Sequence, residues 1–107
     1  MPRPYKRRFV SRIPEVSFFK PAGVRMRDLK EVVLTVEELE ALKLKDVNDL
    51  EQVNCAEQMN ISQPTFHRIL DSARKKVADA IVNGKAIRIE GGNFVLSKIE
   101  DNLKKFK

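Results

Sequence analysis

The feature that most constrains the fold is a long run of apolar residues at helical spacing between Ser62 and Gly84. Ser62 is a favourable N-cap residue, and Pro64 falls in the first turn, where its missing N–H costs nothing. Asn83-Gly84 is a typical helix end. The apolar stripe consists of Phe66, Ile69, Leu70, Ala73, Val77, Ala80 and Ile81. We therefore predict one amphipathic helix from Ser62 to Asn83 that buries this stripe against the rest of the chain.

The sequence before this helix predicts two shorter ones. Thr35 and Glu38 occupy the two positions of a capping box, in which each side chain binds an otherwise unpaired amide. We expect this first helix to run to about Lys45, with Leu34 packed onto Leu39. The second helix is expected from Leu50 to Met59, capped by Asp49. Its inward residues are predicted to be Leu50, Val53, Cys55 and Ala56.

The spacing of the second and third predicted helices is typical of a helix-turn-helix centred on Gln52 to Lys75. Ala56 supplies the small residue needed where the two helices cross, and Asn60 tolerates the positive φ that the turn requires. The residues expected to lock the pair are Cys55, Met59, Ile61, Phe66 and Ile69. The same pattern also fits a three-helix bundle that binds nothing, so the pattern alone leaves both alternatives open.

Short strands are predicted on either side of the helices. Residues 16–20 are β-branched and aromatic and are followed by Pro21-Ala22-Gly23, whereas residues 28–34 fit either a helical turn or a strand. Alternating apolar residues on both sides of Gly91-Gly92 predict a β-hairpin over 86–96, and residues 97–107 fit a short amphipathic helix. The fold expected is mainly α, a three-helix core with an N-terminal strand and a hairpin. The expected segments are a basic arm with a strand (1–34), a helix-turn-helix domain (35–84), and a hairpin with a tail (85–107).

Charge is distributed unevenly along the chain, which has a formal net charge of +6. Residues 1–30 carry nine Lys or Arg and two Asp or Glu, whereas residues 31–61 carry two and eight. Residues 62–92 are cationic again, with six against three. Two cationic segments around an acidic one favour two surfaces facing a polyanion, although a solvated basic tail fits as well. We expect residues 1–12 to be a mobile arm.

Several classes of function are not expected. Cys55 is the only cysteine and His67 the only histidine, so the chain lacks the ligands of a zinc site. Cys55 is better explained as a small buried residue, and the glutamates of the first helix as cap residues and a solvated face. We find no paired carboxylates, no phosphate-binding glycine loop and no nucleophile beside a base, so neither an enzyme nor a cofactor is expected. No apolar run approaches the ~18 residues that span a bilayer, which indicates a cytoplasmic protein without a membrane partner.

The exposed face of the 62–83 helix points to duplex DNA. At about 100° per residue, Pro64, His67, Arg68, Asp71 and Lys75 face outward when Phe66 faces inward, with Gln63 and Thr65 at the flanks. Recognition helices present their N-terminal residues to base edges, where Arg68 suits guanine and Gln63 suits adenine. Ser62 suits a phosphate. Further candidate backbone or minor-groove contacts are Arg3, Lys6, Arg7, Arg8, Arg74 and Lys76.

Two resemblances support this interpretation. The segments VLTVEELEAL (33–42), SQPTF (62–66) and ARKKV (73–77) resemble the promoter-contacting region four of bacterial sigma factors. The whole chain resembles an uncharacterised family, of the UPF or DUF type, of small archaeal and bacterial proteins predicted to bind DNA. Its motifs are PRP (2–4), PEV (14–16), FKPAG (19–23), TF (65–66) with RIL (68–70), and IRIEGG (87–92).

The sigma-like resemblance implies a helix-turn-helix whose base-contacting positions are Gln63, Pro64, His67 and Arg68, with Ser62 near a phosphate. Pro64 has no polar side chain, so contact there is expected to be weaker or based on shape. The function expected is sequence-specific binding of double-stranded DNA in transcriptional regulation. The alternative is a module that docks onto RNA polymerase through an acidic first helix without contacting bases. A homodimer is a further expectation, and Phe18 and Phe19 either form its interface or pack on the chain's own hairpin.

Overall fold

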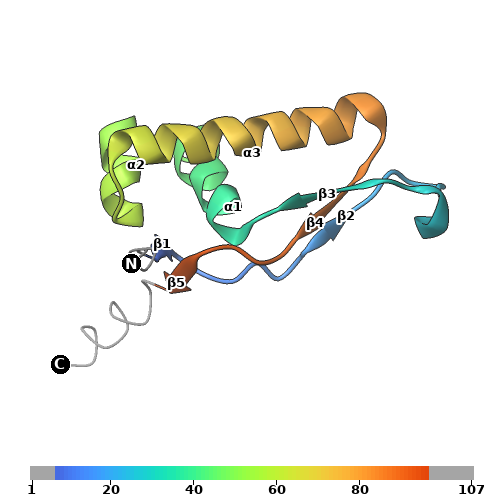
Figure 1. The fold of residues 1–107 in the computed structure, drawn as a ribbon, viewed down its shortest axis with the longest axis horizontal. Helices are drawn as coiled ribbons and strands as arrows, with labels where there is room; N and C mark the ends of the chain where they lie inside the picture. The colour runs from blue at the N-terminus through green and yellow to red at the C-terminus, as the bar shows by residue number, and fades with distance from the viewer. Residues whose placement is uncertain (1–6, 97–107) are drawn as a thin grey trace, which may run out of the picture.

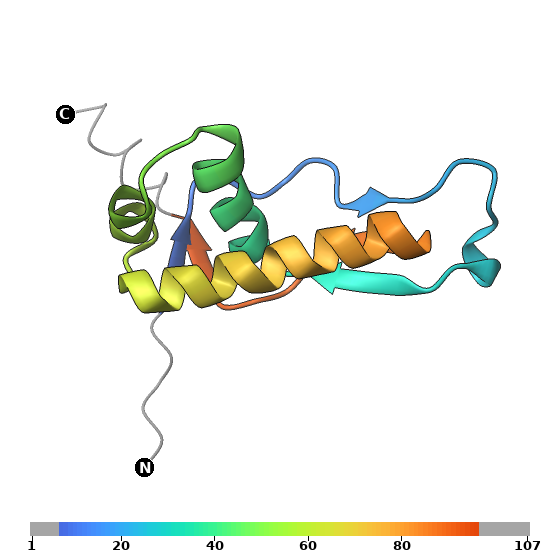
Figure 2. The same cartoon turned by 90° about the horizontal axis from the view of Figure 1, so that it is seen from above.

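The computed structural model describes residues 7–96, which form three helices and five short strands. The strands are β1 (Arg8–Val10), β2 (Phe18–Phe19), β3 (Glu31–Leu34), β4 (Ala86–Ile89) and β5 (Phe94–Leu96). The helices are α1 (Val36–Leu42), α2 (Gln52–Met59) and α3 (Gln63–Asn83), with a 3-10 turn η1 (Met26–Asp28) and a π-helical turn η2 (Lys43–Val47). A helical core with short strands is therefore confirmed, and the tail helix predicted over 97–107 lies outside the described residues. Figures 1 and 2 show α3 running along the length of the molecule above the strands.

Two of the three helix starts are confirmed residue by residue. The Thr35 hydroxyl accepts the Glu38 amide at 3.2 Å, and the Glu38 carboxylate accepts the Thr35 amide at 2.9 Å, which completes the capping box. Ser62 caps α3 by accepting the Thr65 amide at 3.3 Å. Gly84 ends α3 in the left-handed conformation, at φ 65°. These ends were predictable because each depends on one or two local side chains.

The start predicted for the second helix is wrong. Asp49 does not cap it but adopts a left-handed conformation at φ 56°, and α2 begins two residues after Leu50, behind Glu51. The physical reason is that the chain continues from α1 into the π-helical turn η2 before it reverses. The Leu50 amide then donates to the Leu44 carbonyl at 3.1 Å, so Leu50 closes this turn and does not begin a helix.

The strands form two small sheets, and the predicted hairpin over 86–96 is wrong. Strand β4 lies between β2, which is antiparallel to it, and β3, which is parallel, whereas β5 pairs in parallel with β1. Gly91-Gly92 therefore does not reverse the chain. Instead, the Glu90 amide donates to Leu34 and the Gly91 carbonyl accepts the Val36 amide, so this segment follows β3 into the start of α1.

Part of the segment expected to be a mobile arm is a strand, since Arg8–Val10 forms β1. Arg8 pairs with Phe94 and Val10 with Leu96, and Val10 is only 1% exposed. The reason is that β5 continues past β4 and offers β1 an edge, which the hairpin interpretation did not allow. The ambiguous stretch at 28–34 is largely a strand, because Glu31–Leu34 pairs with β4 along its whole length.

Helix α3 packs on two apolar clusters in succession. The first lies between α3 and the helices α1 and α2, and it contains Ala41, Leu44, Cys55, Ala56, Met59, Phe66 and Leu70. The second, against the strands, contains Val10, Leu34, Val36, Ala73 and Ile89. Two predicted core residues are exposed: Ile81 is 74% exposed and Val53 is 40% exposed. Within residues 7–96, Figures 1 and 2 show strands but no second helix beside the end of α3, so Ala80 is buried there and Ile81 is not.

Candidate nucleic-acid interface

Helices α2 and α3 are joined by a tight turn at Asn60-Ile61. Asn60 adopts the left-handed conformation at φ 58°. Its amide donates to Glu57 and the Ile61 amide to Ala56, both at 3.0 Å, so the last carbonyls of α2 are satisfied. Ala56 is 3% exposed where the two helices meet. The positions that the sequence predicted for the small residue and for the positive φ are confirmed.

The inward face of this helix pair is apolar and closely packed. Cys55, Met59 and Phe66 are fully buried, and Ile61 and Ile69 pack against them while partly exposed. Burial raises the pKa of the Cys55 thiol, which lies 3.7 Å from the Leu50 carbonyl oxygen. A buried neutral thiol is a poor nucleophile, so Cys55 acts here as a small packing residue, as predicted.

The outward face of α3 is polar and exposed at its N-terminal half. The predicted outward orientation is confirmed for five residues, all exposed: Pro64, His67, Arg68, Asp71 and Lys75. Gln63, predicted at the flank, is also exposed. Ser62 is exposed as well, and Thr65 is half-buried. The N-terminal turns of α3 thus offer a protruding face of amide, imidazole and guanidinium groups whose opposite side is anchored in the core.

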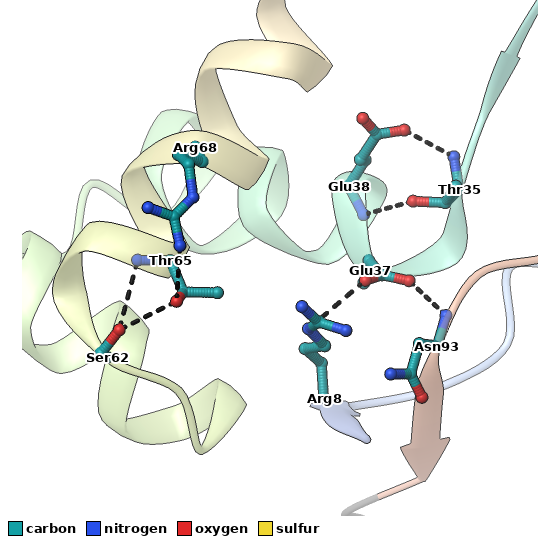
Figure 3. A network of polar contacts seen from close by, with 8 residues as sticks. All are labelled: Arg8, Thr35, Glu37, Glu38, Ser62, Thr65, Arg68 and Asn93. Carbon is teal, nitrogen blue, oxygen red and sulfur yellow. Dashed lines mark hydrogen bonds and ion pairs between the residues drawn. The ribbon is translucent and has the colours of Figure 1, made fainter. Parts of the chain in front are cut away.

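A chain of hydrogen bonds links three of the candidate residues along this face (Figure 3). The Ser62 hydroxyl donates to Thr65 Oγ1 at 2.9 Å, and Arg68 Nη2 donates to the same oxygen at 3.2 Å. These residues are three apart, so they lie on one face of the helix. Thr65 therefore orients the Arg68 guanidinium, and the helix cap orients Thr65.

The other cations predicted on α3 have partners within the described part of the chain. Lys75 pairs with Asp71 at 3.1 Å, and both are exposed, so this contact is weak. Arg74 binds both carboxylate oxygens of Asp46. This contact lowers the pKa of Asp46, mainly through the hydrogen bond from the guanidinium.

Of the candidate cations near the N-terminus, Arg3 and Lys6 lie outside the described residues, and Arg7 is exposed.

Lys76 lies on the α1 side of α3 and not on the outward face. Its Nζ is 2.7 Å from Glu38, which is only 5% exposed and also accepts the Ser72 hydroxyl. Burial alone would raise the pKa of Glu38. The hydrogen bonds from Lys76, Ser72 and Thr35 outweigh burial and lower this pKa. Lys76 thus joins α3 to α1 through a buried carboxylate.

The expectation of a solvated acidic face on the first helix is wrong. Glu37, Glu38 and Glu40 are 8%, 5% and 7% exposed. Glu40 accepts the Ser11 hydroxyl at 3.0 Å, and Glu37 accepts the Asn93 amide. Each carboxylate thus joins α1 to a different segment. The prediction failed because α1 is enclosed by the strands and α3, and local sequence does not distinguish an enclosed helix from an exposed one.

A groove of about 480 Å³ lies beside the turn between α2 and α3. It is lined by Arg8, Glu57, Asn60, Ile61, Ser62 and Thr65. Local sequence does not predict this position of Arg8, because a cluster of basic residues near the N-terminus indicates an arm and not a strand. The one available signal was the pair Phe9-Val10, an aromatic and a β-branched residue of the kinds enriched in strands.

The two phenylalanines considered for a dimer interface differ in their surroundings. Phe18 is half-buried, pairs with Arg88 of β4, and has the Arg88 guanidinium carbon 4.9 Å from its ring centre. Phe19 is 45% exposed. Phe18 therefore packs on its own chain, though on β4 and not on a hairpin, and Phe19 remains available on the surface.

The fold and the site define a small protein of three helices and short strands, and its sequence relatives place it in a family. The model of the family described as "Protein of unknown function DUF134" matches residues 1–97, and the chain belongs to this family. A UPF0251 protein of Thermoanaerobacter pseudethanolicus is 65% identical over 94 residues, covering 88% of this chain and 80% of the relative. A UPF0251 protein of Halothermothrix orenii is 52% identical over 99 residues, covering 92% and 73%.

The resemblance to an uncharacterised bacterial family is confirmed by these matches. No solved structure matches the chain. Between residues 7 and 96, each helix is too short or too polar to cross a membrane.

Proposed function

We propose that the protein binds duplex DNA in a sequence-specific manner and acts as a transcriptional regulator, with α3 as the helix that enters the major groove. The observation that carries this proposal is the arrangement of α2, the left-handed Asn60 turn and α3, which exposes Gln63, His67 and Arg68 at the N-terminal end of α3. This is the position from which recognition helices of the helix-turn-helix class contact base edges.

The roles of the exposed side chains follow from their hydrogen-bonding groups. Arg68 can give two hydrogen bonds to guanine, Gln63 can pair with adenine, and His67 can donate to an acceptor at a base edge. Ser62 lies at the helix N-terminus, where a phosphate is favoured, and Thr65 orients Arg68. Lys75 lies farther along the same face and is placed for a backbone contact. A homodimer on two half-sites about one DNA turn apart belongs to the same proposal.

The alternative, a docking module without base contacts, relied on an acidic surface of the first helix. The three glutamates of α1 are buried, so the described residues do not present that surface. The resemblance to sigma region four is part of the DNA-binding proposal, and it rests on the sequence segments and on the α2–α3 geometry.

The proposal is tested by fluorescence-anisotropy titration of a random-duplex pool, followed by selection of a preferred sequence. Binding is expected at ~50 mM salt and should weaken by orders of magnitude by ~200 mM, because phosphate contacts release counterions. The double variant His67→Ala/Arg68→Ala should lose the preferred sequence. The matched control is Arg27→Ala, an exposed arginine in η1 at the other end of the molecule. Absence of binding at low salt, or equal losses in both variants, would overturn the proposal.

A further inference from the structure

We propose that Arg8 is a second contact to the DNA backbone, held beside the recognition helix by the buried carboxylate of Glu37. This inference rests on the DNA-binding function proposed above and extends the interface from the helix-turn-helix to strand β1. Glu37 is a positioning residue in this scheme, because it acts on DNA only through Arg8.

Arg8 lies on the inward face of its strand. Side chains alternate along a strand, so Arg8 shares a face with Val10, which is 1% exposed and part of the core. The Arg8 side chain is itself only 20% exposed. An arginine in such a position is costly unless its charge is compensated, so its placement needs a specific partner.

That partner is Glu37 of α1. Arg8 Nε lies 3.5 Å from Glu37 Oε2, while Glu37 Oε1 accepts the amide of Asn93 (Figure 3). The Arg8 backbone is also fixed, because its amide donates to the Asn93 carbonyl at 3.0 Å. The Arg8 backbone is thus tied to the segment that leads into β5, and its side chain is tied to α1. Among the described residues, Nε has the carboxylate as an ion-pair partner but no hydrogen bond.

The guanidinium held in this way borders the groove beside the α2–α3 turn. Ser62 and Thr65, the first residues of the proposed recognition face, line the same groove. Figure 3 shows Arg8 between Glu37 and the chain of Ser62, Thr65 and Arg68. When α3 enters a major groove, this flank faces the sugar-phosphate backbone, and a planar guanidinium suits a phosphate well. Glu57 also borders the groove, and its charge opposes a phosphate there.

The direction in which Glu37→Gln changes DNA affinity distinguishes two explanations. Either Glu37 positions Arg8, or only the net charge near the DNA matters. Removing a negative charge near DNA should strengthen binding if charge alone matters. If Glu37 holds Arg8 in place, Glu37→Gln should weaken binding even though it makes the protein more cationic. Glu57→Gln is the matched control, because it removes a carboxylate that borders the groove and should strengthen binding.

The experiment measures the dissociation constant of the full chain for a duplex at several salt concentrations by fluorescence anisotropy. Arg8→Ala is expected to weaken binding about tenfold at low salt and to reduce the slope of log Kd against log salt by about 1. Arg8→Lys should retain the slope, because the charge remains. Arg12→Ala is the control for losing an exposed arginine from the same segment; Arg12 borders a different groove, with Glu40 and Lys43, and should leave the slope nearly unchanged. Circular dichroism checks that every variant is folded.

Two results would overturn the inference alone: a slope for Arg8→Ala equal to that of Arg12→Ala, or tighter binding by Glu37→Gln than by the wild type. If Glu37→Gln does not fold, Glu37→Asp replaces it, since this variant keeps the charge but shortens the reach to Arg8 and Asn93. If Arg68→Ala loses binding but Arg8→Ala binds like the wild type, this inference fails while the proposed function stands. A wild type that does not bind duplex DNA would overturn both proposals.

Discussion

Gly92 lies so close to the carboxylate of Glu37 that a β-carbon at position 92 would overlap Glu37 Oε1. Gly92 also has a φ of +107°, a conformation that other residues rarely adopt. Gly92→Ala is therefore expected to lower the free energy of unfolding by about 3 kcal/mol, through backbone strain and displacement of a buried carboxylate. Gly91→Ala is the matched control: its φ is +74° but its surroundings are open, so only a strain of about 1 kcal/mol is expected. Urea denaturation followed by circular dichroism measures both, and equal losses would contradict the close packing on Glu37.

A second prediction concerns the hydroxyl that orients Arg68. Thr65→Val keeps the shape of the side chain but removes the oxygen that Arg68 Nη2 contacts at 3.2 Å. On the proposed function, binding to the selected DNA sequence should weaken about fivefold, as expected for one hydrogen bond worth about 1 kcal/mol. Thr65→Ser retains the hydroxyl and should bind like the wild type. Weakening by Thr65→Ser but not by Thr65→Val would mean that the methyl group, and not the hydroxyl, is responsible.

The turn between α2 and α3 gives a third prediction, which does not depend on function. Asn60 has a φ of 58°, where glycine is favoured and a β-branched residue is strongly disfavoured. Asn60→Gly should leave the free energy of unfolding within about 1 kcal/mol of the wild type, whereas Asn60→Val should lower it by about 2 kcal/mol. Thermal and urea unfolding measure the difference. If valine were tolerated as well as glycine, the left-handed turn would not be required.

The buried network around Glu38 predicts a dependence of stability on pH. The folded pKa of Glu38 is below its ordinary value, so its contribution to stability is present above that ordinary value and is lost as pH falls through the folded pKa. Glu38→Gln should therefore lower the free energy of unfolding by about 3 kcal/mol at pH 7, and its deficit relative to the wild type should shrink at acidic pH, below the ordinary pKa of a glutamate. Glu57→Gln, a change at an exposed glutamate, should have little effect at either pH. A deficit of constant size would show that the charge of Glu38 does not contribute.

The contrast between Phe18 and Phe19 predicts separable effects on stability and assembly. Phe18→Ala removes the ring that lies against Arg88 and should lower the free energy of unfolding by about 2 kcal/mol. Phe19→Ser should change stability little, because this residue is 45% exposed. If two copies associate through Phe19, as the dimer proposal requires, Phe19→Ser should shift the sedimentation coefficient to that of a monomer. A dimer that survives this substitution would exclude Phe19 from the interface.

The parts of the fold that were predictable from the sequence are those determined by neighbouring residues. The capping box at Thr35, the cap at Ser62 and the end at Gly84 each involve side chains within one helical turn, and all three are confirmed. The orientation of Arg68 followed from the apolar stripe of the same helix. By contrast, the start of α2 depends on how α1 ends, and Asp49 alone carries no information about the π-helical turn before it.

The parts that were not predictable depend on contacts between distant segments. The alternation around Gly91-Gly92 correctly indicated two strands, but their partners, β3 and β1, lie more than fifty residues away along the chain. The burial of Glu37 and the position of Arg8 in the groove follow from that pairing. Two short strands that flank glycines predict a hairpin from local sequence. Pairing of each strand with a distant strand can be predicted only if the free edges of those distant strands are known.

The pairing of β1 with β5 also determines when, during synthesis of the chain, Arg8 can take its place beside the α2–α3 turn. Synthesis releases the N-terminus first, so Arg8–Val10 has no partner strand until Phe94–Leu96 has been added. All three helices are already present at that stage, and the turn between α2 and α3 can form without β5. A nascent chain stopped before residue 94 would therefore contain α2, the turn and α3 but lack the strand that fixes Arg8 beside them.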